Sequence, residues 1–248
     1  MEFSEAVRLA REAPADSGIG TLGEKLTHAA LKLWLEPDRT RHEVLLPDGG
    51  VADIFDGRQV TEIQTAGFSA FRPKLERLLA QYPVTVVHPL VRQKQLVWID
   101  PATGEAGAQH RSPRRGSFTD AGGELIYLLP CLFHPQLTVR LLLLDVEEHR
   151  LADGRRSRDG KRGSHRLERY PLALADTLTL TAPADYAALI PPTLPQEFTA
   201  AAFGKAARLQ GRPLNGTLKL LRAAGCLDRD ESVRPYRWQR TENMTNRI

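Results

Sequence analysis

The chain has 248 residues, of which 42% are hydrophobic, and this fits one globular core with a smaller second module. No apolar run approaches the roughly 20 residues of a membrane-spanning helix, and the amino terminus lacks the layout of a signal peptide, so we expect a cytoplasmic protein without a membrane partner. Its two cysteines, Cys131 and Cys226, form neither a disulfide framework nor a zinc motif, which suits a reducing compartment.

The net charge of +4 is mild, but its distribution is uneven. Residues 150–169 contain eight Lys or Arg against three Asp or Glu, and residues 199–240 contain nine against three. Such clusters can neutralise phosphates, which favours nucleic acid as a partner, but they also occur on solvated loops.

The first hundred residues predict helices and strands in an α-β-β-β-α-β order. Apolar residues at helical spacing predict a leader helix over 3–12 and a second helix that begins at Ile19 or Leu22 and ends at Leu35. Short β-branched and apolar runs predict strands at 42–46, 51–55 and 60–65, separated by "PDGG" and "DG" turns. A helix over 68–80 follows, with Phe71, Leu75, Leu78 and Leu79 facing inward. Two further strands are expected at 83–89 and 95–100.

The remaining sequence is less regular. Residues 101–117 are expected to form a loop, 120–129 a helix, and 137–147 and 170–180 strands. From residue 183, helices separated by short turns precede the strand-like "RPYRWQR", a pattern typical of a winged helix-turn-helix or of a small helical cap. We therefore expect one domain over 1–182 and a second module over 183–248.

Acidic residues occupy two of the predicted strands. Asp53 lies in "VADIF", and Glu62 and Gln64 lie in "VTEIQ". A two-residue turn would make the two acids diagonal neighbours, and a four-residue turn through Gln59 would place Asp53 opposite Glu62. Both turns leave Asp53, Glu62 and Gln64 on one face, since side chains alternate along a strand, and only a three-residue turn would separate them.

Two carboxylates side by side on a half-buried sheet repel each other and lose hydration. A divalent cation removes both penalties, and Mg²⁺ typically takes one or two carboxylates and keeps several waters. The alternative is that both acids face solvent or pair with Arg58, Arg72 or Lys74.

This arrangement resembles the PD-(D/E)XK nuclease superfamily, with Asp53 at the family aspartate, Glu62 at the second acid, and Gln64 at the usual lysine. The resemblance covers about residues 19–89 and implies a restriction-endonuclease-like α/β core with a mixed sheet. It further implies Mg²⁺ or Mn²⁺ held by Asp53 and Glu62, and endonuclease cleavage of nucleic acid, with DNA ahead of RNA. Glu24 matches a further metal-linked glutamate of several members. The whole chain also resembles uncharacterised bacterial proteins with a domain of unknown function.

Several points are left open by the resemblance. Gln64 cannot supply the positive charge of the family lysine, so the alternative function is a catalytically inactive nucleic-acid-binding or regulatory protein with the same fold. A protein-protein adaptor on the same scaffold is the third option. Lys25 and Lys74 could replace that lysine, and Glu24 could instead complete a capping box with Thr21. A basic loop is expected to grip the phosphate backbone, and a homodimer stays possible. The loop residues are Arg155, Arg156, Arg158, Lys161 and Arg162.

Overall fold

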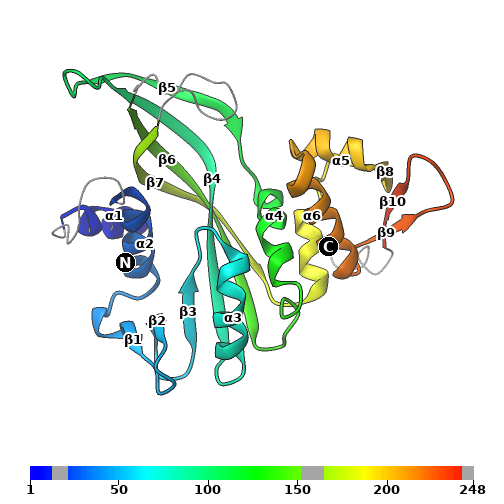
Figure 1. Ribbon diagram of the computed structural model, residues 1–248, viewed down its shortest axis with the longest axis horizontal. Helices are drawn as coiled ribbons and strands as arrows, with labels where there is room; N and C mark the ends of the chain where they lie inside the picture. Colours follow the sequence, from blue (N-terminus) through cyan, green and yellow to red (C-terminus); the bar gives the residue numbers. More distant parts are fainter. Residues whose placement is uncertain (13–21, 152–164, 242–248) are drawn as a thin grey trace. The chain divides into compact units, whose positions relative to one another are not determined.

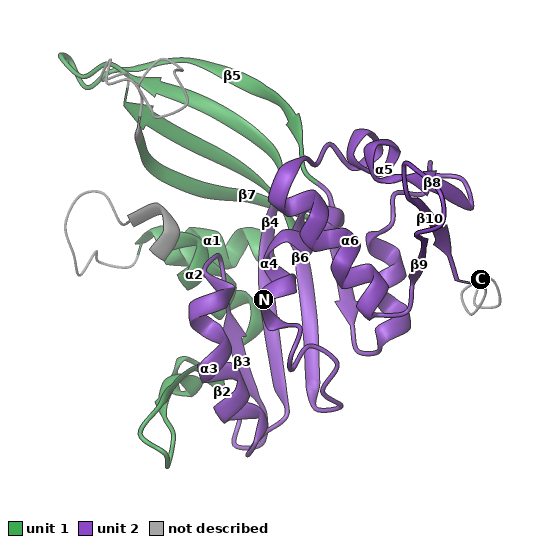
Figure 2. Cartoon of the chain, turned by 45° about the vertical axis from the view of Figure 1, so that its right-hand side comes forward, with its two compact units in different colours: residues 1–54, 91–116, 143–176 green, residues 55–90, 117–142, 177–248 purple. Residues whose placement is uncertain are grey.

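The computed structural model describes residues 1–12, 22–151 and 165–241, with the backbone alone for residues 22–25 and 165. The chain is mixed α/β, as the sequence predicts, and Figure 1 shows its elements. It divides into two compact units (Figure 2). Unit 1 combines Met1–Ile54, Val91–Gly116 and Leu143–Asp176, and unit 2 combines Phe55–Leu90, Ser117–Leu142 and Thr177–Ile248.

Two helices that pack on each other begin unit 1, α1 (Phe3–Glu12) and α2 (Leu22–Leu35). The rings of Phe3 in α1 and Trp34 in α2 meet in a T-shaped arrangement with centroids 5.8 Å apart. The predicted leader helix is therefore confirmed. Helix α1 buries one amphipathic face, made of Phe3, Ala6, Val7 and Ala10.

A seven-stranded mixed sheet contains most of the strands. Their order is β1-β2-β3-β4-β6-β7, and β5 pairs with β4. The β3–β4 pair is parallel, whereas β1–β2 and β4–β5 are antiparallel. The strands are β1 (His42–Leu45), β2 (Val51–Phe55), β3 (Val60–Ile63), β4 (Val84–Ile99), β5 (Ala106–Arg115), β6 (Leu137–Leu151) and β7 (His165–Leu180).

In unit 2, helix α3 (Phe68–Leu79) connects β3 to β4. Gly67 precedes the helix with a φ of 73°, a left-handed conformation that glycine adopts without steric penalty. The helix buries the four residues that the sequence predicts, together with Phe68: Phe71, Leu75, Leu78 and Leu79.

The C-terminal part of unit 2 is defined here as the C-terminal module. It begins with a 3-10 helix, Pro183–Leu189, where the sequence suggests an α-helix. A three-stranded antiparallel sheet in the order β8-β10-β9 and two helices follow. These are β8 (Glu197–Thr199), α5 (Ala200–Ala207), α6 (Gly211–Ala223), β9 (Leu227–Asp230) and β10 (Arg237–Arg240).

Helix α6 packs against the short helix α4 (Gly122–Leu125) within unit 2. A side chain at Gly122 would begin only 2.7 Å from Thr217 Cγ2 of α6, so glycine permits the close approach of the two helices. Thr119, just before α4, donates a hydrogen bond from its hydroxyl to the Leu189 carbonyl at 2.8 Å. The α4 region and the C-terminal module therefore share one core.

Both cysteines are free thiols in unit 2, Cys226 buried and Cys131 half-buried. Burial raises the pKa of each thiol to about 11. Within residues 1–12, 22–151 and 165–241, no helix is long and apolar enough to cross a membrane.

Two strand predictions are wrong. The strands expected at 83–89 and 95–100 are one continuous strand, β4, which runs through Pro89. The loop expected over 101–117 contains the edge strand β5, almost all of whose side chains are exposed.

Candidate functional site

Asp53 lies in β2 of unit 1, where strand alternation separates it from the buried Ala52 and Ile54. Its Oδ2 is 3.1 Å from Nε2 of His28 in α2, and both side chains are largely shielded, with 21% and 27% exposed. The structure thus gives the predicted aspartate a histidine partner. His28 is not among the site residues that the sequence predicts.

Glu62 lies in β3 of unit 2 and is 3% exposed. A buried carboxylate needs a charged or hydrogen-bonding partner, because it loses its hydration. Lys74 of α3 provides one, with its Nζ 2.6 Å from Glu62 Oε2, so for Glu62 the structure has the Lys74 pair that the sequence analysis gave as the alternative to a cation. The Lys74 side chain remains 32% exposed, so the ammonium links a buried acid to the protein surface.

Gln64 follows β3 directly, and its backbone N–H donates to the Val87 carbonyl at 2.9 Å. Its side-chain amide donates to the carbonyl of Ala66. The backbone carbonyl of Gln64 accepts a hydrogen bond from Nδ1 of His88 at 2.6 Å. Burial lowers the pKa of His88, and the imidazole also meets the Phe68 ring, so His88 acts as a structural residue that fixes the end of β3.

The turn that leads into β3 also lies in unit 2. The N–H of Asp56 donates to the Gln59 carbonyl at 3.4 Å, and the Asp56 carboxylate accepts from the N–H groups of Arg58 and Gln59 at 2.8 and 2.7 Å. Of the turns considered from the sequence, the structure therefore has the one that runs through Gln59.

Asp53 lies in unit 1, and Glu62, Gln64 and Lys74 lie in unit 2, where a direct contact joins Glu62 to Lys74. The side chains of Glu24 and Lys25 lie outside the described residues. So do the predicted phosphate-gripping residues Arg155, Arg156, Arg158, Lys161 and Arg162.

One sequence signal could have identified His28. In "GEKLTH" it follows Glu24 by four residues, a spacing that puts two side chains on the same helix face one turn apart. Within the described ranges, no group of three or more His, Cys, Asp or Glu side chains is placed to hold a metal ion.

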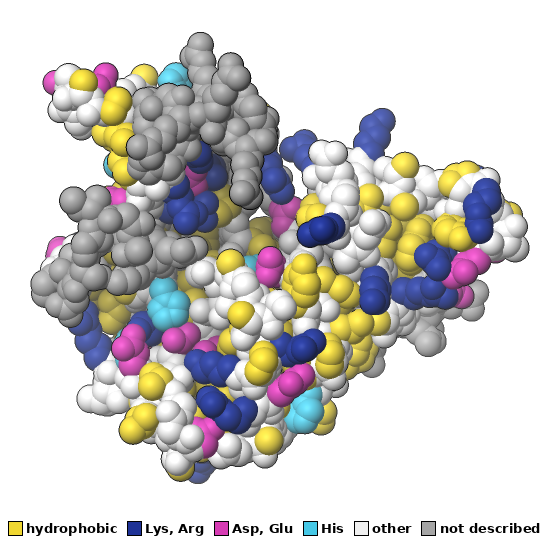
Figure 3. All heavy atoms as spheres, in the orientation of Figure 1, with side chains coloured by type: hydrophobic (Ala, Val, Ile, Leu, Met, Phe, Trp, Pro, Cys, Tyr) yellow, Lys and Arg dark blue, Asp and Glu magenta, His cyan; other side chains and the backbone are white. Residues whose placement is uncertain are grey.

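A second candidate site lies in the C-terminal module of unit 2. A hollow of about 630 Å³ lies among α6, β9, β10 and the start of α5. Figure 3 shows basic and hydrophobic side chains side by side over this module. Its charged and aromatic lining consists of Lys219, Arg222, Arg229, Arg234, Tyr236 and Trp238.

Stacking and ion pairs position this lining. The guanidinium carbon of Arg229 is 4.7 Å from the centroid of the Tyr236 ring, and that of Arg234 is 3.8 Å from the same ring. Glu231 accepts hydrogen bonds from Arg229 and, at 3.3 Å, from Arg222. The hollow therefore presents arginine side chains, positioned by stacking and ion pairs, beside the Tyr236 ring. This combination suits the binding of phosphates and bases.

Residues 25–181 match the model of a protein family described as a domain of unknown function, DUF8091. The chain belongs to this family. An uncharacterised protein of Treponema pallidum (strain Nichols) is 31% identical over 137 residues, covering 54% of this chain and 53% of that protein. The chain thus spans about half the length of this relative. No solved structure matches the DUF8091 chain.

Proposed function

We propose that this protein is a metal-dependent nuclease that hydrolyses nucleic-acid phosphodiester bonds, DNA ahead of RNA. The observation that carries the proposal is the ion pair of Lys74 with the buried Glu62. The neutral side chain of Gln64 cannot provide positive charge beside a scissile phosphate. Lys74 can, because its ammonium lies next to Glu62 of β3. The exposed fraction of Lys74 leaves it accessible to a phosphate.

Asp53 and Glu62 would hold the metal ion, since carboxylate oxygens are the ligands that Mg²⁺ and Mn²⁺ accept. The two-carboxylate set fits Mg²⁺, which commonly keeps waters in its other positions. When bound, the ion supplies charge to polarise the phosphodiester and to lower the pKa of water. His28 and Lys74 would hold the two carboxylates in place, Lys74 would neutralise charge on the phosphate, and Gln64 would orient water or phosphate.

The order of elements supports a restriction-endonuclease-like core. Helix α2, strands β1 to β3, helix α3 and strand β4 follow one another in the α-β-β-β-α-β order of the PD-(D/E)XK superfamily. The turn at Asp56–Gln59 is the one for which Asp53 is expected opposite Glu62. Glu24 stays a candidate metal-linked residue of α2.

The C-terminal module supports nucleic acid as the substrate class. Its order β8-α5-α6-β9-β10 and its β8-β10-β9 sheet favour a winged helix over a helical cap. The basic hollow lies between α6 and the β9–β10 hairpin, the two elements of such a module that approach nucleic acid. A cytoplasmic location and a homodimer remain predictions.

The alternative function is a nucleic-acid-binding protein that does not cut. The contacts of Gln64 favour it, because the amide is engaged by the Ala66 carbonyl. Cleavage requires one of two conditions. Either the Gln64 amide turns toward water or phosphate, or Lys74 neutralises the phosphate charge without any contribution from Gln64.

Incubation of the purified protein with plasmid, single-stranded DNA and RNA, each with Mg²⁺ or Mn²⁺, tests the proposal. We expect metal-dependent cleavage that Asp53→Asn and Glu62→Gln abolish and that Lys74→Met slows by roughly 100-fold, the cost of losing a charge-stabilising group. Glu76→Gln, an exposed change in the same helix α3, should cut at the wild-type rate. Binding without cleavage under every metal condition would establish the alternative, and cleavage by Glu62→Gln would exclude the assigned site.

A further inference from the structure

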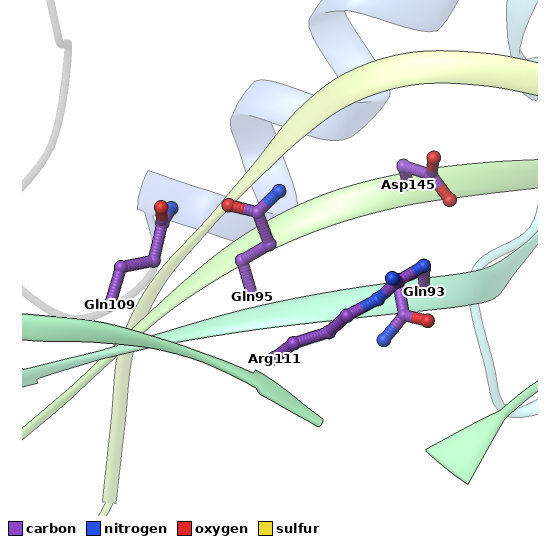
Figure 4. Close-up of a pocket in the computed structure, with 5 residues that line it drawn as sticks. All are labelled: Gln93, Gln95, Gln109, Arg111 and Asp145. Carbon is purple, nitrogen blue, oxygen red and sulfur yellow. The ribbon is translucent and has the colours of Figure 1, made fainter. Parts of the chain in front are cut away.

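A second hollow lies in unit 1, on strands β4, β5 and β6, with a volume of about 460 Å³. Figure 4 shows the five side chains that line it, all of them polar. Gln95 and Arg111 are paired across β4 and β5, and Val97 is paired with Gln109. The lining residues are Gln93, Gln95, Gln109, Arg111 and Asp145.

Gln93 contains a buried acceptor without a donor. The residue is 6% exposed, and its Nε2 donates to the Ser112 carbonyl at 2.8 Å. Its Oε1 is buried and has no hydrogen-bond partner. A buried carbonyl oxygen without a donor is unfavourable, so this position calls for an N–H or O–H group from outside the chain.

Two further side chains of the hollow make no hydrogen bond. Within the described part of the chain, neither the Gln95 amide nor the Arg111 guanidinium donates or accepts one through its side chain, and the charge of Arg111 interacts with that of Asp145. Gln109 donates a hydrogen bond from Nε2 to Glu147 at 2.8 Å, which leaves its side-chain oxygen Oε1 available as an acceptor. The hollow therefore offers a donor–acceptor pair from Gln95, acceptors from Gln93 and Gln109, and a guanidinium.

The fifth residue, Asp145, is already committed. Arg92 binds it through two hydrogen bonds, Nε to Oδ1 at 2.8 Å and Nη2 to Oδ2 at 2.5 Å. These bonds lower the pKa of Asp145, so the carboxylate remains charged at neutral pH. Asp145 thus balances the positive charge of this face and disfavours a purely anionic ligand.

The required ligand presents adjacent donors and acceptors on a planar edge. An amide side chain matches the N6 and N7 atoms of adenine, and a guanidinium matches the O6 and N7 atoms of guanine. The five lining residues include no aliphatic or aromatic side chain, whereas pockets for apolar small molecules are lined mainly by such groups.

We propose that this hollow binds purine edges of a nucleic-acid strand and gives the protein a base preference. Gln95 and Arg111 would contact the base edge, and Gln93 Oε1 would accept from an exocyclic amine. The inference rests on the proposed function only in taking nucleic acid as the ligand. It assigns base reading to unit 1 and leaves phosphate hydrolysis to other residues.

The test is selection from a duplex library and a single-stranded library, each with randomised central positions, carried out in EDTA so that no cleavage occurs. We expect the wild-type protein to enrich a purine at one or more positions by about tenfold, the discrimination of one paired contact. Gln95→Leu and, separately, Gln93→Met should flatten this preference and leave affinity for the unselected library within about twofold. Gln136→Leu, which changes an exposed amide of unit 2, should keep the wild-type preference.

Circular dichroism melts of each variant show whether the fold is retained, and Gln95→Leu keeps the test decisive if Gln93→Met does not fold. Absence of purine enrichment, or its persistence in Gln95→Leu, overturns the inference. Competition by free purine nucleotides that removes all library binding would also overturn it, since the site would then serve a small ligand. Loss of preference in a protein that never cuts would support it and reject only the nuclease proposal.

Discussion

At the scale of single residues, Glu148 is an unusually well-defined buried acid. It lies in β6 of unit 1 with 1% of its side chain exposed. Lys94, Arg150 and Arg169 bind its two oxygens at 2.7 to 2.8 Å. Burial alone would raise the pKa of Glu148, but the hydrogen bonds from these cations outweigh it and lower the pKa to about 2.

We expect Glu148→Gln to lower the free energy of unfolding by about 3 kcal/mol at neutral pH, because three half-buried cations lose their shared anion. The depressed pKa gives stability that is present above pH 4.5, the ordinary value, and is lost as the pH falls toward 2. The difference between wild type and variant should therefore shrink below about pH 4. Urea unfolding over this range measures it, with the exposed Glu12→Gln as the control; a constant difference would contradict the account.

The candidate site shows what residue patterns can and cannot predict. Strand alternation and turn chemistry identify Asp53, Glu62 and Gln64, since these depend on neighbours along the chain. The pairing of Lys74 with Glu62 depends on how α3 packs against β3, so the sequence offers Lys74 only as one of several partners. His28 was overlooked because its partner Asp53 is twenty-five residues away.

At the scale of elements, apolar periodicity is the deciding signal. The core helix α3 and the short strands β2 and β3 carry it and are found close to their predicted bounds. Strand β5 has no buried face, so its sequence contains no alternation to detect. Pro89 suggested a strand end, but it lies between the stretch of β4 that pairs with β3 and the stretch that pairs with β5. Its missing N–H therefore falls outside the residues of β4 that pair with β3 or with β5.

The contact of α4 with α6 supports an element-scale prediction. We expect Gly122→Ala to lower the free energy of unfolding by about 1–3 kcal/mol, because the added methyl would overlap Thr217 and force the helices apart. Chemical denaturation measures the change. Gly107→Ala in β5 is the matched control, since its Cβ would meet only the Trp98 carbonyl at 3.4 Å. Equal stability of the two variants would show that α4 and α6 separate at little cost.

At the scale of the whole molecule, the sequence places a domain boundary after residue 182, and the structure gives a physical way to examine it. Thr119 bonds to Leu189, Phe133 meets the Tyr186 ring with centroids 5.5 Å apart, and Gly122 faces Thr217. Each contact joins residues on either side of that boundary within unit 2. A change in residue pattern along a sequence indicates where one segment ends and the next begins. It does not show the surface on which the segment packs.

We therefore expect residues 1–182 expressed alone to melt at lower temperature than the full chain and to aggregate, because the α4 face becomes exposed. Thermal melts by circular dichroism and size-exclusion chromatography measure both. A chain that ends at Thr241 retains every described residue and should match the full-length protein. A cooperative, monomeric 1–182 fragment of full stability would instead confirm the boundary that the sequence predicts.

The two free cysteines allow local unfolding of unit 2 to be followed in the wild-type chain. Cys131 and Cys226 both belong to unit 2, and unit 1 has no thiol. Because few of these groups ionise near neutral pH, alkylating reagents should modify them chiefly when the surrounding structure opens. The rate of alkylation would then follow local unfolding of unit 2 alone, without an introduced label and without a signal from the strands of unit 1.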